Sequence, residues 1–191
     1  MENRKIILAS ASPRRKEIME QAGYEFEIKV SHKEEFYTST EPAEIVKELA
    51  LLKANDIAEQ VEQKNVAIIG ADTVVAHGGK ILGKPKSKEE AFEMIHAFQG
   101  ENHQVYTGVA ILEFDELGNK KVSNEAVRTD VYVNPMTDEE IWNYIEKDNV
   151  MDKAGSYGIQ SGFAIHIEKI DGDYFNVVGL PISYIYEQLK K

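Results

Sequence analysis

The amino-acid sequence predicts a mixed α/β fold, in which a mixed and twisted sheet is flanked by helices. Runs of β-forming residues and amphipathic helical patterns are interspersed along the chain, without the strict repetition of a βαβ protein. Two capping boxes indicate helix starts, and two long β segments follow one another around a turn. Because 191 residues suffice for one well-cored domain, we expect residues 1–191 to form a single domain, with or without two lobes.

In the first half of the chain, strands are short apolar or alternating runs, and helices begin or end at recognisable signals. Pro13 and Pro42 suit the start of a helix, Gly23 suits a helix end, and Ser87 with Glu90 forms a capping box. In chain order we expect a strand over 5–9, a helix over 13–21, a strand over 24–30, a helix over 40–63, a hairpin with an HGGK turn over 65–85, and a helix over 87–99.

The second half begins with the two long β segments and contains the second capping box, Thr137 with Glu140. The pair Asp171-Gly172 is typical of a tight turn, and Pro181 suits the start of a last helix. We expect strands over 103–114 and 120–133, a helix over 138–147, a β-hairpin over 162–178 and a closing helix over 180–191.

The composition limits the class of protein. A formal net charge of −11 argues against a general nucleic-acid binder, which needs clustered cations. The chain has no cysteine, which excludes disulfides and thiolate chemistry and fits a reducing compartment, and its histidines lack zinc-site spacing. No apolar run approaches the length of a signal sequence or a membrane span. We therefore expect a cytoplasmic protein with no membrane and no nucleic-acid partner.

Three consecutive cations, Arg14, Arg15 and Lys16, fall in the first turn of the helix predicted over 13–21. The helix dipole favours acidic residues there, by roughly 0.3–1 kcal/mol for each. One interpretation is a solvated basic turn. The other is an anion site, because the N–H groups of a helix N-terminus and two arginines suit a phosphate. Ser10, in the loop before this helix, joins the phosphate-binding candidates.

Asp72 and Lys53 occupy positions where a charge is costly. Asp72 interrupts the apolar run IIGADTVV, so it must be paired, metal-bound, protonated or satisfied by nearby backbone N–H groups. Lys53 must either extend to solvent or meet an anion, because it falls near the middle of the apolar stripe of its helix. That stripe contains Ile45, Leu49, Leu52 and Ile57.

Two further candidates lie on predicted loops. Lys84, in LGKP, follows a strand end and could reach a ligand, although a surface lysine is the ordinary interpretation. Gln160 lies in DKAGSYGIQSG, a stretch of small residues suited to close approach of the backbone. Its amide offers a donor and an acceptor, as recognition of a nucleobase edge requires.

Together these stretches resemble the Maf family of nucleoside-triphosphate pyrophosphatases. The resemblance implies hydrolysis of a nucleoside triphosphate to the monophosphate and pyrophosphate with a divalent metal, Mg²⁺ or Mn²⁺. It also implies a two-lobed fold with a cleft, of the Maf and inosine-triphosphatase type, and a homodimer. The resemblance runs almost end to end through LASASPRR, LALLKA, IIGADTVV, LGKP, HQVYTGV, DKAGSYGIQ and GDYFNVVGLP.

The resemblance also assigns roles to residues. Asp72 matches the family's catalytic proton acceptor, and Glu35, which we favour over Glu34, matches its acidic residue after the second strand. Glu35 and Asp72 would then hold the metal. The phosphate-binding candidates are Ser10, Arg14, Arg15, Lys53 and Lys84.

Within the family, one branch prefers dTTP and UTP and another prefers 7-methyl-GTP. The residues that mark the pyrimidine branch appear here as Arg14, Thr73 and Gln160, so the resemblance implies the dTTP/UTP type. Ser161 departs from the pattern, because a glycine commonly follows the glutamine. Three alternatives stay open: the 7-methyl-GTP branch, a nucleotide-binding regulator of septum formation without useful turnover, and a nucleotidyltransferase with a second substrate.

Overall fold

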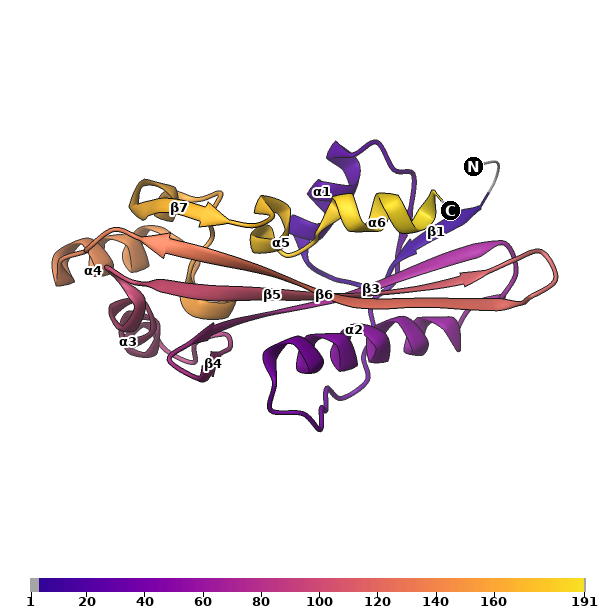
Figure 1. The fold of residues 1–191 in the computed structure, drawn as a ribbon, viewed down its shortest axis with the longest axis horizontal. Coiled ribbons are helices and arrows are strands. Elements are labelled where there is room, and N and C mark those ends of the chain that lie inside the picture. Colours follow the sequence, from indigo (N-terminus) through magenta and orange to yellow (C-terminus); the bar gives the residue numbers. More distant parts are fainter. Residues whose placement is uncertain (1–3, 191) are drawn as a thin grey trace. The chain divides into compact units, whose positions relative to one another are not determined.

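The structure, a computed structural model, describes residues 4–190 and confirms the mixed α/β fold. Strands and helices alternate irregularly along the chain (Figure 1). The strands are β1 (Lys5–Leu8), β2 (Glu27–Ile28), β3 (Val66–His77), β4 (Lys80–Leu82), β5 (Asn102–Phe114), β6 (Lys120–Val133) and β7 (Ile167–Asp171). The helices are α1 (Pro13–Gln21), α2 (Pro42–Ala58), α3 (Lys88–Phe98), α4 (Asp138–Lys147), α5 (Tyr174–Val178) and α6 (Ile182–Leu189), with 3₁₀ turns η1 (Ala154–Ser156) and η2 (Gly162–His166).

The strands form one mixed sheet in the order β2-β1-β3-β5-β6-β7, with β4 beside β3. β1 runs parallel to both of its neighbours, and its register places Leu8 opposite Ile69 of β3. β4 is antiparallel to β3, and β7 is antiparallel to β6. The β3–β4 hairpin turns at Gly78 and Gly79, whose φ values of 56° and 75° are typical of the predicted HGGK turn.

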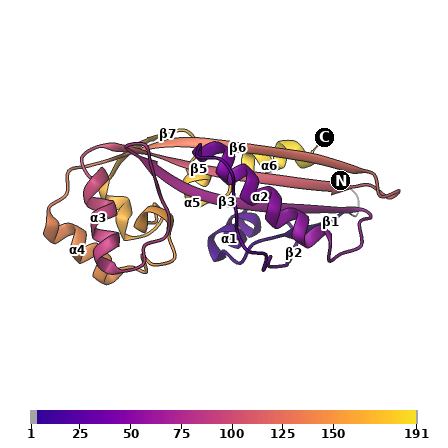
Figure 2. The same cartoon turned by 90° about the horizontal axis from the view of Figure 1, so that it is seen from below.

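The chain divides into two compact units. Among the described residues, the first comprises 4–72, 107–127 and 179–190, and the second comprises 73–106 and 128–178. In the first unit, α2 lies on one face of the sheet and α1 and α6 lie on the other (Figure 1). In the second, α3 packs against α4 and η1, and α4 packs against η2 (Figure 2). The predicted cleft stays a prediction.

Two glycines let α2 lie against the sheet of the first unit with almost no space between the backbones. A Cβ atom on Gly70 of β3 would meet the carbonyl oxygen of Ala50 at 2.2 Å. A Cβ atom on Gly108 of β5 would meet that of Val46 at 2.1 Å. Both distances are far below van der Waals contact, so only glycine allows this approach.

The predicted hairpin over 162–178 is wrong. Its first part is η2 followed by β7, and its second part is the helix α5 rather than a strand. Tertiary contacts override the β propensity of YFNVV: Asp173 Oδ1 accepts a hydrogen bond from Phe175 N at 2.8 Å and so begins the helix. The buried Asn176 then donates to Val105 O and Thr129 Oγ1.

Two other predicted elements are shorter than expected. The strand predicted over 24–30 consists only of Glu27–Ile28. The helix predicted over 40–63 ends at Ala58, whose carbonyl accepts a hydrogen bond from the side chain of Gln63 at 2.9 Å. None of the helices within residues 4–190 combines the length and the apolar character needed to cross a membrane.

Candidate active site

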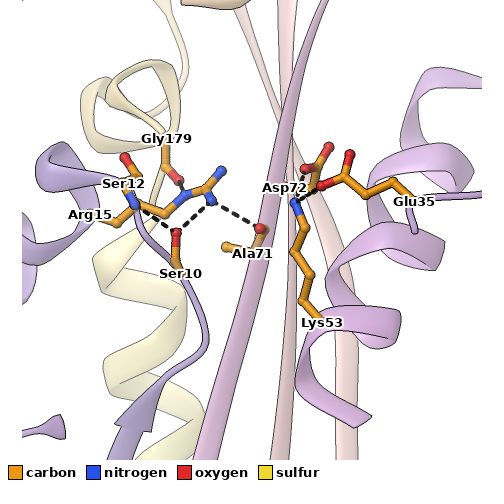
Figure 3. A network of polar contacts seen from close by, with 8 residues as sticks. All are labelled: Ser10, Ser12, Arg15, Glu35, Lys53, Ala71, Asp72 and Gly179. Carbon is orange, nitrogen blue, oxygen red and sulfur yellow. Dashed lines mark hydrogen bonds and ion pairs between the residues drawn. The ribbon is translucent and has the colours of Figure 1, made fainter. Parts of the chain in front are cut away.

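The centre of the candidate site is the ammonium group of Lys53, which lies between two carboxylates (Figure 3). Lys53 Nζ is 2.6 Å from Asp72 Oδ1 and 2.8 Å from Glu35 Oε1. The side chains of Lys53 and Asp72 are only 15% and 13% exposed, whereas Glu35 is 54% exposed. The structure thus pairs the two costly charges that the sequence singled out, and Lys53 meets an anion.

The close approach of α2 to β3 creates this pair. Asp72 lies two residues beyond Gly70 on β3, and Lys53 lies three residues beyond Ala50 on α2. Because the two backbones meet at Gly70 and Ala50, the Lys53 side chain is close enough to contact Asp72 directly. A pair this sheltered from water interacts more strongly than a surface ion pair.

The irregular loop that carries Glu35 is fixed to α2 at both ends. On one side, Glu48 accepts hydrogen bonds from Thr38 N at 2.6 Å and from Thr38 Oγ1 at 3.0 Å. On the other, Lys33 Nζ lies 3.0 Å from Oε2 of Glu59, the residue that follows α2, and 4.0 Å from Oδ1 of Asp56 in α2. Glu35 lies between these two attachments, so its approach to Lys53 is supported by the surrounding loop.

Arg15 ties three segments together on the opposite side of β3 from Lys53 (Figure 3). Its Nε donates to Gly179 O at 2.8 Å, and its Nη1 donates to Ser10 Oγ and to Ala71 O, both at 3.0 Å. Burial lowers the pKa of the Arg15 guanidinium, and the charge of Asp72 opposes that shift. Arg15 thus places a guanidinium group beside the end of α1 where an anion is favoured.

In the loop before α1, the side chain of Ser10 is the main polar contact. Ser12, the N-cap of α1, makes no side-chain capping bond, and its backbone N–H donates to Ser10 Oγ at 3.2 Å. Ser10 therefore holds both the turn and Arg15. Arg14 and Arg15 are half-buried in the first turn of α1, and the charge of Arg14 contributes to lowering the pKa of Arg15.

Five of the predicted site residues come together in the first unit: Ser10, Arg15, Glu35, Lys53 and Asp72. Arg14 is adjacent to Arg15 in the sequence. Sequence reasoning missed the carbonyl groups of Ala71 and Gly179, which orient Arg15. A backbone acceptor leaves no side-chain signal in a sequence. Only the motif GDYFNVVGLP, which contains Gly179, indicated that its segment matters.

The other three predicted site residues, Thr73, Lys84 and Gln160, belong to the second unit. Lys84 is exposed, Thr73 is half-buried on β3, and Gln160 is exposed. The loop that leads to Gln160 is held close to that of Lys84, because Gly155 N donates to Gly83 O at 3.0 Å. A Cβ atom on Gly155 would lie 2.8 Å from the Val75 side chain, which confirms the expected close approach of this loop.

Comparison with known proteins identifies the family. The profile described as Maf-like protein matches residues 5–191. The chain belongs to the Maf family. It is 46% identical over 186 residues to a dTTP/UTP pyrophosphatase from Lachnoclostridium phytofermentans, covering 97% of this chain and 94% of the relative. It is 48% identical over 189 residues to a dTTP/UTP pyrophosphatase from Bacillus anthracis, covering 98% of this chain and 95% of the relative.

Membership of the Maf family confirms the resemblance inferred from the seven motifs. Among solved structures, the Ham1 protein of Staphylococcus aureus matches with a TM-score of 0.48 and 14% identity, covering 97% of this chain and 98% of that one. The roles of individual residues in this Maf protein stay predictions, which the geometry of the Lys53 and Arg15 contacts now makes specific.

Proposed function

We propose that this Maf protein is a nucleoside-triphosphate pyrophosphatase that hydrolyses dTTP and UTP to the monophosphate and pyrophosphate. The observation that carries the proposal is its near full-length similarity to relatives named dTTP/UTP pyrophosphatase. The polar centre around Lys53 supports it, because a sheltered carboxylate beside clustered cations suits the hydrolysis of a polyanion.

Asp72 would act as the proton acceptor. In the proposed reaction, the oxygen of a water molecule bonds to the α-phosphorus while Asp72 takes the proton that the water loses. The bond between the α-phosphorus and the bridging oxygen to the β-phosphate then breaks, and pyrophosphate leaves. The ion pair with Lys53 supports this role, because it holds the Asp72 carboxylate in place.

Cations of the first unit would hold the triphosphate. Arg14 and Arg15, together with the backbone N–H groups at the start of α1, offer donors to the phosphate oxygens. Lys53 would neutralise the charge that develops on the leaving pyrophosphate, once its contact with a carboxylate gives way to a phosphate oxygen. From resemblance to the family, we propose that Lys84 shares this task.

Glu35 and Asp72 are the residues that would hold a divalent metal. Their donor chemistry fits Mg²⁺ or Mn²⁺, because hard carboxylate oxygens from two segments already surround one cation, the Lys53 ammonium. No group of three or more metal-binding side chains occurs among residues 4–190. Two carboxylates still suffice for Mg²⁺ when substrate phosphates complete its coordination. When bound, the metal would polarise the phosphoryl oxygens and acidify a water molecule.

Selection of the base is assigned to Arg14, Thr73 and Gln160, on resemblance to the pyrimidine branch of the family. Gln160 is exposed, and no described residue makes a hydrogen bond with its amide, which leaves both polar atoms available to a base edge.

We further propose that the protein acts in the cytoplasm as a homodimer without a nucleic-acid partner. Its sequence isoelectric point near 5.0 supports the last of these points.

A panel of nucleoside triphosphates, with Mg²⁺ and with Mn²⁺, tests the proposal. Pyrophosphate and orthophosphate are measured separately, with and without a chelator. We expect pyrophosphate from dTTP and UTP, and none after chelation. Orthophosphate as the product, or preference for 7-methyl-GTP, would contradict the proposed reaction or branch. Binding without turnover would favour a regulatory protein, and pyrophosphate only with a second substrate would favour a nucleotidyltransferase.

A further inference from the structure

The side chain of Ser161 closes the turn that presents Gln160. The turn runs from Gly158 to Ser161, and both donors of Ser161 engage the same oxygen. The Ser161 backbone N–H donates to Gly158 O at 3.1 Å, and the Ser161 hydroxyl donates to it at 2.9 Å. A glycine at this position would keep only the first bond and would add backbone freedom.

The turn is also attached to α4 through the backbone of Gly158. The hydroxyl oxygen of Tyr144 in α4 accepts a hydrogen bond from Gly158 N at 3.2 Å. Asp148, which directly follows α4, accepts a hydrogen bond from Lys153 Nζ at 3.2 Å. The turn is thus closed by the Ser161 hydroxyl and attached to the neighbouring helix through Gly158.

Gln160 is the exposed residue of an otherwise enclosed segment. Residues 155–159 are all buried, whereas Gln160 is exposed and follows them directly. Because the backbone is held at Gly158 and at Ser161, the direction in which Gln160 leaves the turn is fixed from both sides. Rigid support of this kind is what a side chain needs in order to discriminate between similar ligands.

We propose that Ser161 is a positioning residue for nucleotide selection, whose hydroxyl orients Gln160 toward a pyrimidine base. This rests on the proposed function, in particular on base reading by Gln160. It assigns to Ser161 no contact with the nucleotide and no part in the chemical step. Ser161 would therefore sharpen selectivity while leaving the catalytic centre unchanged.

The test compares Ser161→Ala, Ser161→Gly and Ser161→Thr with the parent on a panel of dTTP, UTP, dCTP and GTP. Loss of one intramolecular hydrogen bond changes an equilibrium about fivefold, so Ser161→Ala should lower the preference for dTTP over dCTP about fivefold. Ser161→Gly should lower it about tenfold, since backbone freedom is added. Ser161→Thr keeps the hydroxyl and should restore the preference, and turnover of saturating dTTP should stay near that of the parent.

The matched control is Thr137→Ala, which removes the capping box at the other end of α4. It should lower stability without changing the nucleotide ranking. If Ser161→Ala changes the ranking no more than this control does, the inference is wrong. The ranking is also measured by binding, as the rise in melting temperature that each nucleotide causes without metal. If the parent binds nucleotides without turnover, the proposed hydrolysis is refuted, and the binding ranking still tests the role of Ser161.

Discussion

Gly70→Ala should damage the candidate active site without touching any of its side chains. The new Cβ atom would lie 2.2 Å from Ala50 O and 2.9 Å from Ala54 N, both backbone atoms of α2 that cannot rotate away. Ordinary contact requires about 1 Å more, so α2 must move away from β3. Overpacking of this kind typically costs about 1–3 kcal/mol.

The displacement should also separate Lys53 from Asp72, whose atoms now lie 2.6 Å apart. A misplacement of about 1 Å can lower the rate of a catalysed step about a hundredfold. For a chain of this size, about 1–3 kcal/mol corresponds to a fall in melting temperature of about 2–12 °C. We therefore expect Gly70→Ala to lose both stability and most of its turnover.

Calorimetry and pyrophosphate release under saturating dTTP measure the two effects. The control is Gly83→Ala, because a Cβ atom on Gly83 meets no other group within 4 Å and its backbone needs no positive φ. It should keep the melting temperature of the parent. If Gly70→Ala has the melting temperature and the turnover rate of the parent, the close approach of α2 to β3 does not position Lys53.

Two further predictions concern Arg15 and His103. Arg15→Lys cannot keep three directed bonds, so the free energy of unfolding should fall by about 2–4 kcal/mol in urea titrations, and an unchanged value would refute its tying role. His103 is fully buried, and burial together with the charge of His77 lowers its pKa to about 3. In the unfolded chain this histidine has its ordinary pKa of about 6.5, so the unfolded chain binds a proton at higher pH than the folded protein does. The free energy of unfolding therefore falls as the pH drops below about 6.5, by about 2 kcal/mol at pH 5. His103→Gln should flatten that decline; a decline as steep as that of the parent would contradict it.

Much of the fold could be predicted because its signals are local. The capping box of Thr137 and Glu140 does begin α4, and Gly78-Gly79 does form a hairpin turn. The helical α5 could not be predicted from YFNVV. Its conformation depends on contacts of Asn176 with Val105 and Thr129, which are distant in sequence.

In the candidate site, too, some features could be predicted from local sequence patterns and others depend on contacts between distant segments. Asp72 and Lys53 could be singled out, because a charge within an apolar pattern needs a partner. That they pair with each other depends on the approach of α2 at Gly70, which no spacing rule predicts. Two of the three acceptors of Arg15 lie 56 and 164 residues away, on backbone carbonyls that any residue could provide.

The most direct test of the account is turnover of dTTP by Asp72→Asn. The substitution keeps the volume of the side chain and removes its negative charge, while Glu35 remains as a partner for Lys53. We expect a protein that folds and melts close to the parent, with pyrophosphate release slowed about 10²- to 10⁴-fold, as loss of a general base predicts. Turnover within about tenfold of the parent would show that Asp72 is not the proton acceptor.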